Sequence, residues 1–365
     1  MTDLDDTLPG LPVSRPTGVG LCLSGGGYRA MLFHLGTLWR LNDAGYLPKL
    51  TRISSVSGGS ITAGLLGCTW RNLEFDQTGV AIDFLEHVVE PILAMGRYTL
   101  DVPAVLKGLL FGGVAHEVEG VYDRMLYHGA TLQSLPDDNS GPRFIIMATD
   151  LSNGVGWRFS RPYMRDYKTA NYPNPTLPLA QAVAASSAFP PFLSPVVLNL
   201  VDGKHATLTD GGVYDNLGIE PVLKNCGTIF VSDAGGPFKE EPRPHRGWIL
   251  GTYRVLLTLQ AEVGWLRKRQ VMAALKSTTN DLKGAFWAVT TDPTDFPAFA
   301  STLPVPVTAA KRLGDTPTRL KALPDETLYG LVNWGYAAAD AGLRSYVDPH
   351  LPEPPGFPLP GGVGV

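Results

Sequence analysis

The chain has 365 residues, of which 44% are hydrophobic and 18% charged, and its formal net charge is −4. This composition is typical of a folded globular protein and excludes intrinsic disorder, and the absence of a long basic block argues against nucleic-acid binding. Its three cysteines are widely separated and odd in number, so we expect neither a disulfide framework nor a zinc site, and a reducing compartment is the simplest interpretation.

The first part of the chain alternates short apolar runs with helical periodicity. Gly18–Ser24 is an apolar run of strand length that stops at three glycines, and Tyr28–Gly45 has the apolar spacing of a helix. A second run, Thr51–Val56, leads into a serine–glycine turn and a further helix. A strand, a glycine turn and a helix, repeated in this order, predict a parallel α/β sheet.

The rest of the chain carries the same two kinds of pattern. Residues 81–130 are mostly helical by periodicity, with a glycine-rich break at Phe111–Gly113. Further strands are expected at Arg143–Thr149, Gly156–Ser160, Val196–Leu200, Ala206–Thr209 and Thr228–Ser232. Further helices are expected at Pro178–Ala188, Asn216–Lys224, Trp248–Lys276 and Asp325–Val347.

No repeat or clear linker divides the chain, although its length alone would allow two domains. We expect a tail over residues 1–17, a core over 18–235, a helical and strand extension over 236–348 packed on the same core, and a Pro/Gly-rich tail over 349–365. There is no signal-peptide pattern and no apolar stretch of the ~20 residues that span a bilayer, so we expect a cytoplasmic protein.

The glycine loop Gly25–Gly27 follows the first strand and opens the first helix. With Ala30 it matches a dinucleotide fingerprint, but the second strand ends in Ser55–Ser57 without the acidic residue that holds a ribose. No Gly-Lys-Ser/Thr follows, which excludes a P-loop. A dinucleotide site is therefore disfavoured, and the other two interpretations are a tight turn that only requires glycine and an oxyanion hole made by amides at a helix N-terminus.

Two further turns carry residues with catalytic chemistry. Ser57 lies between a strand and a helix, as the nucleophile of a G-x-S-x-G elbow does, and Gly59 meets its need for small neighbours. Ser55 stands where the elbow has glycine, so the motif is not literal. Taken alone, this cluster is typical of an ordinary loop, and Asp210, followed by two glycines, is typical of a hairpin turn.

Together, the segments SGGGYRA, SVSGGS and TDGGVYDN resemble the patatin-like phospholipase family. The match extends to Ala185–Phe192, which is similar to the family's segment ahead of the catalytic aspartate, and covers about residues 18–235, with Ser55 as its one departure. The resemblance implies a single large α/β domain of three layers, in which helices flank both faces of a mostly parallel central sheet.

The resemblance also implies a lipid acyl hydrolase with a Ser–Asp dyad and no cofactor or metal. Ser57 would attack the ester carbonyl of a phospholipid, a lysophospholipid or an acylglycerol, and Asp210 would accept its proton. The oxyanion would be held by the amides of Gly25, Gly26, Gly27 and Gly58. A transacylase with the same acyl-enzyme and a catalytically silent lipid-binding or scaffold protein are the alternatives, and the oligomeric state is left open.

Several polar residues have two interpretations each. Arg29 would orient an anionic phosphate or pair with a surface acid, and the second is favoured. His34 on the first helix is expected to be packed or at an interface rather than catalytic. The histidines show no metal-binding spacing, and the two that follow Asp210, His245 and His350, lie in proline-rich surroundings that do not suit a catalytic triad.

Two apolar segments lie outside the motifs. The helix at Trp248–Lys276 combines apolar residues with the basic run Arg267–Arg269. It would lie transiently on a membrane surface or pack on the protein core, and the second is favoured. Leu106–Phe111 would line an acyl pocket or belong to an ordinary core helix, and the second is again favoured.

Overall fold

A sheet of ten strands runs through the part of the chain that the computed structural model describes, which is residues 17–364 without 101–113, 169, 191, 192, 194, 202, 246, 279 and 299–302. The strands are β1 (Val19–Leu23), β2 (Leu50–Val56), β3 (Arg143–Asp150), β4 (Val155–Phe159), β5 (Tyr163–Arg165), β6 (Asn171–Pro173), β7 (Val196–Asn199), β8 (His205–Asp210), β9 (Thr228–Asp233) and β10 (Lys283–Ala288). The neighbours β10, β9, β1, β2 and β3 are all parallel, whereas β4–β8 join in antiparallel pairs. The predicted α/β class with a largely parallel central sheet is confirmed.

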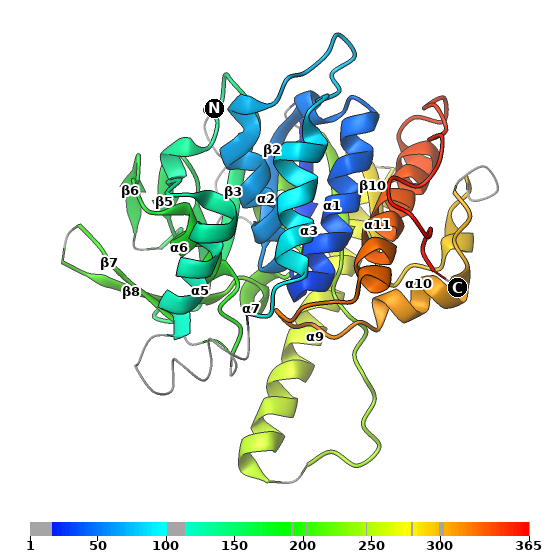
Figure 1. The fold of residues 1–365 in the computed structure, drawn as a ribbon. Helices are drawn as coiled ribbons and strands as arrows, with labels where there is room; N and C mark the ends of the chain where they lie inside the picture. The colour runs from blue at the N-terminus through cyan, green and yellow to red at the C-terminus, as the bar shows by residue number, and fades with distance from the viewer. Residues whose placement is uncertain are drawn as a thin grey trace.

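Helices cover both faces of this sheet (Figure 1). They are α1 (Gly27–Asp43), α2 (Gly58–Thr69), α3 (Glu90–Gly96), α5 (Val114–Tyr122), α6 (Leu179–Ser186), α7 (Gly212–Asp215), α8 (Glu220–Leu223), α9 (Trp248–Lys276), α10 (Val307–Gly314) and α11 (Asp325–Tyr346). Successive residues of β1 enter two separate cores, since Leu21 and Leu23 pack in the larger core with α1, α2 and α11. Cys22 packs in the smaller core with residues of α8 and the last turns of α9. This alternation is what a sheet buried on both faces requires.

The C-terminal part of the chain joins the same body. Strand β10 pairs with β9 at the sheet edge, and α11 packs along α1. The two helices approach so closely that a Cβ atom at Gly36 would lie 1.8 Å from the carbonyl oxygen of Val332. Arg40 and Asp340 form a buried ion pair of 2.8 Å across the same contact. Residues 349–364 then fold back on α11, where the Asn333 amide donates to the backbone.

The segment after Asp210 differs from its prediction. A helix was expected at Asn216–Lys224, but a turn separates the short helices α7 and α8. Gly218 has a φ of 64°, which a helix does not accommodate, and the Asp215 carboxylate accepts the amides of Leu217 (3.2 Å) and Glu220 (3.1 Å).

Other elements were found or missed for physical reasons. The long strands and helices predicted by periodicity lie within one or two residues of their expected bounds. The short strands β5 and β6, the edge strand β10 and the helix α10 were not predicted, because three to eight residues carry too little pattern. The glycine break at Phe111–Gly113 and the segment Leu106–Phe111 lie outside the described residues. Within the described part, no helix is both long and apolar enough to cross a membrane.

Candidate active site

The pairing of β3 brings Ser57 and Asp210 together. Strand β2 pairs with β3 as far as Val56, which lies opposite Met147. Strand β8 pairs with β3 from the other direction and ends with Asp210 opposite Ala148. Since β4 occupies the other edge of β3, β2 and β8 share one edge and meet end to end. Asp210 therefore lies where the chain leaves β2 at Ser57.

Ser57 occupies a strained turn between β2 and α2. Its φ of 50° and ψ of −119° lie outside the regions that a residue with a side chain normally adopts. The turn is held by the Ser57 amide, which donates to Ser186 Oγ at 2.9 Å. Gly58 is required because a Cβ atom there would lie 2.0 Å from the carbonyl oxygen of Gly27. Ser57 is only 7% exposed, so little of the residue contacts solvent.

Ser55, the departure from the elbow motif, is accommodated by hydroxyl contacts. It is buried, and its Oγ lies 3.0 Å from Ser60 Oγ, which in turn lies 2.9 Å from Ser186 Oγ. Ser186 donates to the Met147 carbonyl at 2.6 Å and so connects this cluster to β3. The cluster satisfies buried polar groups behind the elbow, which explains why serine is tolerated at position 55.

Asp210 is a buried carboxylate with defined partners. It is 3% exposed, its Oδ1 accepts the Gly212 amide at 2.7 Å, and its carboxylate forms a hydrogen bond with the Ser57 side chain. Burial raises the pKa of Asp210 to about 6, although the Gly212 and Ser57 hydrogen bonds lower it. At neutral pH the group is therefore ionised, and it is a better proton acceptor than an exposed aspartate.

The glycine loop lies directly against the elbow. Gly26 and Gly27 have φ values of 147° and 59°, which L-residues with side chains rarely adopt. A Cβ atom at Gly25 would lie 3.2 Å from Ser57 Cβ, so the loop passes beside the serine. The Gly25 amide donates to the Asn216 carbonyl at 3.0 Å and is engaged within the protein. The N-termini of α1 and α2 thus both converge on Ser57 with their partial positive charges.

His34 supports the glycine loop through a network of hydrogen bonds that we did not predict from the sequence. It is fully buried, and burial lowers its pKa to about 3, so the ring is neutral. His34 Nε2 lies 2.9 Å from the Ser24 carbonyl and donates to it, so Nδ1 accepts from Ser232 Oγ at 2.9 Å. The ring fixes the residue before Gly25, in agreement with a packed rather than a catalytic histidine. No sequence pattern pointed to this role, because Ser24 directly follows β1 whereas Ser232 lies on β9, far away in the sequence.

Arg29 is buried beside the same loop. Its Nε donates to the Ala234 carbonyl at 3.0 Å, its Nη2 to Thr318 Oγ1 at 2.9 Å, and its Nη1 to the Thr316 carbonyl. Burial lowers the pKa of Arg29 to about 10. The guanidinium therefore connects α1 to the segment before α11. The sequence had favoured a pair with a surface acid, but the hydrogen bonds of Arg29 go to two carbonyls and a threonine hydroxyl. A role in orienting substrate stays an untested prediction.

Neither late histidine lies near Asp210. His245 is exposed, and its carbonyl oxygen lies 3.3 Å from the Cβ position at Gly251, early in α9. His350 is exposed in the segment after α11, two residues before Pro352, whose carbonyl accepts from Arg40. Arg40 lies about 20 Å along α1 from the glycine loop, at 1.5 Å per residue. His350 is therefore at the end of α1 that is far from the glycine loop and Asp210. Among the residues that the structure describes, no group of three His, Cys, Asp or Glu side chains could hold a metal ion.

The fold and the site define a class of protein, an α/β protein with a serine elbow and a buried aspartate at the carboxyl end of a parallel sheet. The model of the patatin-like phospholipase family matches residues 21–223, which is more than half of the chain, and the protein belongs to this family. No curated protein matches the sequence significantly.

Two solved structures of a human phospholipase have a similar fold. Human GIVD cytosolic phospholipase A2 is 13% identical with a TM-score of 0.50, over 89% of this chain and 58% of that chain. The same protein in complex with methyl gamma-linolenyl fluorophosphonate inhibitor and terbium chloride is 15% identical with a TM-score of 0.51, over 89% of this chain and 57% of that chain. This chain thus spans less than two thirds of the length of that phospholipase.

Proposed function

We propose that this protein is a lipid acyl hydrolase that cleaves carboxylic esters through an acyl-enzyme on Ser57. The observation that carries the proposal is the strained Ser57 in hydrogen-bond contact with the buried Asp210. Membership of the patatin-like phospholipase family supports lipid acyl hydrolysis in general. The long-chain fluorophosphonate bound by the human phospholipase is a phosphorus analogue of a fatty acyl ester, which supports a fatty acyl substrate here.

In the proposed mechanism Ser57 Oγ attacks the ester carbonyl while Asp210 takes the hydroxyl proton. Asp210 returns this proton to the leaving alcohol as the ester C–O bond breaks, which leaves the acyl-enzyme. Water then attacks the acyl-enzyme while Asp210 accepts its proton. Asp210 passes this proton to Ser57 Oγ as the bond between the acyl carbon and Ser57 Oγ breaks, which releases the free acid and restores the serine. Because a carboxylate is a weak base for an alcohol, most of the acceleration comes from positioning and from stabilisation of the oxyanion.

The oxyanion hole is assigned to the amides of Gly26, Gly27 and Gly58. The sequence had also assigned Gly25, but this amide already donates to the Asn216 carbonyl, so we leave it out. The remaining amides lie at the first turns of α1 and α2, where helix amides have no intrahelical acceptor. The close contact between Gly27 and Gly58 supports a single oxyanion site made by both sets of amides.

Two alternatives share the fold. A transacylase would form the same acyl-enzyme and pass the acyl group to an alcohol in place of water. A silent lipid-binding or scaffold protein would need neither a strained serine nor a buried carboxylate bonded to it. Both features destabilise a folded protein, by about 1–3 kcal/mol for a strained backbone residue, so their presence favours an enzyme.

We predict hydrolysis of medium-to-long acyl esters in micelles, and no hydrolysis of matched peptides. Turnover of both substrates should be measured with the wild type and with Ser57→Ala as control. Activity confined to acetyl esters would indicate a general esterase with a small pocket. Mass spectrometry of the products would detect acyl transfer to an added alcohol. If the alcohol were the preferred acceptor over water, the protein would be a transacylase.

We predict that an organophosphonate labels Ser57 covalently, because its hydroxyl is bonded to a carboxylate and faces helix amides. Peptide mapping of the adduct identifies the serine. The neighbouring Ser55 and Ser60, whose hydroxyls face each other behind the elbow, should remain unlabelled and serve as internal controls. An adduct on either of them would contradict the assignment of the nucleophile.

We predict that Asp210→Asn lowers kcat/KM at least about a thousandfold, as Ser57→Ala does, since the two groups act as a unit. The matched control is Asp150→Asn, because Asp150 is also buried at a strand end and accepts the amide two residues on, at 2.8 Å. The control variant Asp150→Asn should keep most of the activity, and so should the variants His245→Ala and His350→Ala. If a folded His245→Ala or His350→Ala variant were as inactive as Ser57→Ala, the catalytic group would be a triad with that histidine and not a Ser–Asp dyad.

We predict that kcat/KM on an uncharged ester falls about tenfold per pH unit below pH about 6. Burial raises the pKa of Asp210 to about 6, and the base works only when ionised, so activity is lost as pH falls through this value. Circular dichroism at each pH separates this effect from unfolding. A profile that stays flat down to pH 4 would show that Asp210 is not the base.

A further inference from the structure

Helix α9 projects from the body of the protein (Figure 1). Only its last turns are anchored in the core, where Val271 and Ala274 are buried with residues of α8 and β9. None of the described side chains from Trp248 to Leu266 is buried, although this stretch has only two charged residues. At 1.5 Å per residue the stretch from Trp248 to Leu266 is about 27 Å long. A helix this apolar is normally covered.

One face of the projecting part carries an apolar stripe, which consists of Trp248, Val255, Leu259 and Leu266. Their spacings of seven, four and seven residues place them in one line along a helix. They are 82%, 58%, 60% and 58% exposed, respectively. In the described part of the chain, therefore, nothing covers this stripe.

The segment before α9 holds another side of the helix. Phe238 packs edge-on against Trp265 with ring centroids 6.3 Å apart, and the Arg254 guanidinium lies 4.2 Å from the centre of the Phe238 ring. Arg254 also donates to the Lys239 carbonyl at 2.8 Å. The loop thus supports the projecting helix and leaves the apolar stripe open.

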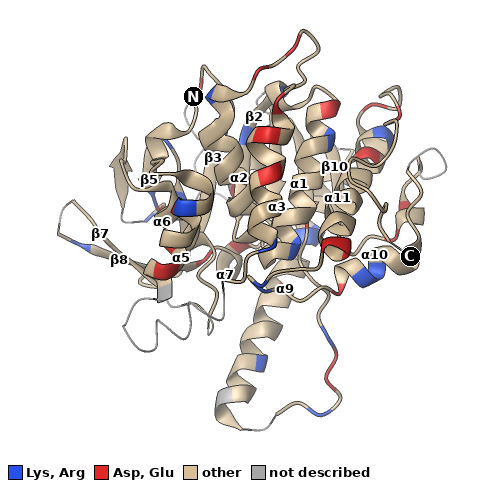
Figure 2. Cartoon of the chain, viewed as in Figure 1, with Lys and Arg blue, Asp and Glu red and all other residues tan. Residues whose placement is uncertain are grey.

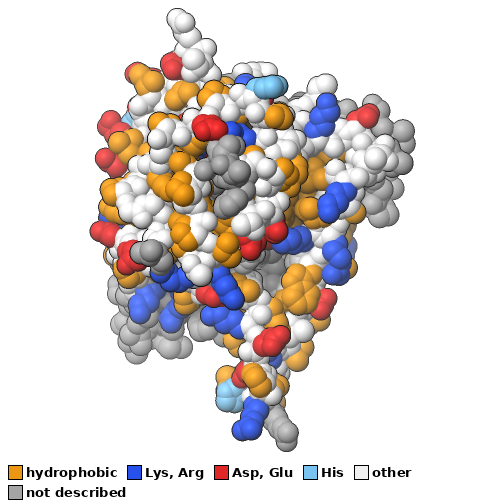
Figure 3. All heavy atoms as spheres, turned by 90° about the vertical axis from the view of Figure 1, so that its right-hand side faces the viewer, with side chains coloured by type: hydrophobic (Ala, Val, Ile, Leu, Met, Phe, Trp, Pro, Cys, Tyr) orange, Lys and Arg blue, Asp and Glu red, His pale blue; other side chains and the backbone are white. Residues whose placement is uncertain are grey.

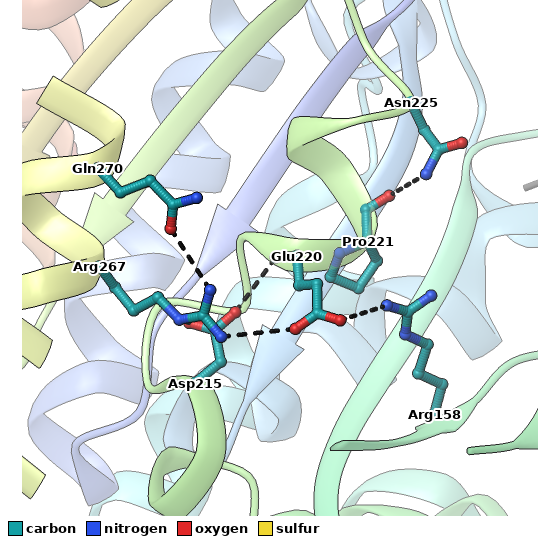
Figure 4. A network of polar contacts seen from close by, with 7 residues as sticks. All are labelled: Arg158, Asp215, Glu220, Pro221, Asn225, Arg267 and Gln270. Atoms are coloured by element: carbon teal, nitrogen blue, oxygen red, sulfur yellow. Dashed lines mark hydrogen bonds and ion pairs between the residues drawn. The ribbon is translucent and has the colours of Figure 1, made fainter. Parts of the chain in front are cut away.

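The base of the helix is fixed next to the candidate active site. Arg267 lies 4.0 Å from Asp215 and 3.5 Å from Glu220, in the segment that follows Asp210 (Figure 4). Glu220 in turn contacts Arg158 of β4 at 3.4 Å. Gln260 Nε2 lies 3.3 Å from the position that a Cβ atom would take at Gly212. The stripe therefore extends outward from the turn that holds Asp210.

The charge of this region is opposite to that of the rest of the protein. Residues 236–276 contain eight Lys and Arg and three Glu, a net charge of +5 in a chain whose total is −4. Exposed positive residues include Lys239, Arg243 and Arg269. Lys and Arg lie along the loop and the helix (Figure 2), and His and Lys or Arg side chains lie near the end of the projection (Figure 3). An anionic surface would attract this region and not the remainder.

We propose that the apolar stripe of α9 docks on an anionic lipid bilayer. The stripe enters the interface between headgroups and acyl chains, with Trp248 at a depth that suits an indole ring, while the basic side chains contact the headgroups. This docking rests on the proposed function, because it places the Asp210 turn at the surface that holds a lipid ester. It also accounts for an apolar helix that the described part of the chain leaves uncovered next to this turn.

The test is sedimentation with phosphatidylcholine vesicles that contain or lack phosphatidylglycerol. The wild type should bind the anionic vesicles, and added salt should weaken the binding. The variant Val255→Ser/Leu259→Ser/Leu266→Ser should bind at least about tenfold more weakly. The matched control is Ile82→Ser/Leu151→Ser/Val201→Ser, at exposed apolar positions outside α9, and should bind as the wild type does.

Activity separates this proposal from the proposed function. Both triple variants should hydrolyse a soluble short-chain ester like the wild type, and only the α9 variant should lose hydrolysis of vesicle lipid. Vesicle binding without any ester hydrolysis would refute the function and leave the docking intact. Absence of vesicle binding, or equal binding by both triple variants, would overturn the docking. A dimer in light scattering that the α9 variant abolishes would show that a second copy covers the stripe, which would also overturn it.

Discussion

The candidate active site depends on one register in the sheet. Met147 and Ala148 are consecutive on β3, and they pair with the last residue of β2 and the last residue of β8, respectively. Two strands that run in opposite directions therefore end at the same place along one edge. A shift of one residue in either pairing would move Asp210 away from the turn that carries Ser57, and a shift of β8 would also turn the Asp210 side chain to the other face. The precision of the site thus comes from backbone pairing rather than from loops.

Close packing of the glycine loop against the serine elbow also brings the positive ends of two helices to the candidate site. The glycine loop and the serine elbow touch through Gly27 and Gly58, where no side chain would fit, and this contact brings two helix N-termini to one point. In the proposed mechanism these amides would be fixed before substrate arrives, so no reorganisation would be needed as negative charge develops. The buried His34 and Arg29 hold the loop from the protein side through carbonyls of Ser24 and Ala234. Rigid support of this kind is what an oxyanion site requires.

Much of the fold could be predicted from the sequence, but only part of the site geometry. Long periodic elements such as α1 and α11 are specified by local pattern, whereas β10 is defined by its partner β9 and carries little signal of its own. Ser57 and Asp210 were identified through motifs that resemble a family, since no local rule relates a turn after β2 to one after β8. The engagement of the Gly25 amide and the network around His34 could not be predicted, because both depend on residues distant in sequence.

Burial of Asp210 has two opposed consequences that the site balances. Removing the carboxylate from water raises its pKa and so increases its strength as a base, but the same desolvation disfavours the ionised form that the proposed mechanism requires. The Gly212 amide and the Ser57 hydroxyl offset part of this cost by lowering the pKa, and the net result is a pKa of about 6. An aspartate with more hydrogen-bond donors around it would favour its ionised form but accept a proton less readily, whereas one with fewer would favour its protonated form. Two hydrogen bonds to a buried carboxylate therefore suit a base that works without a histidine.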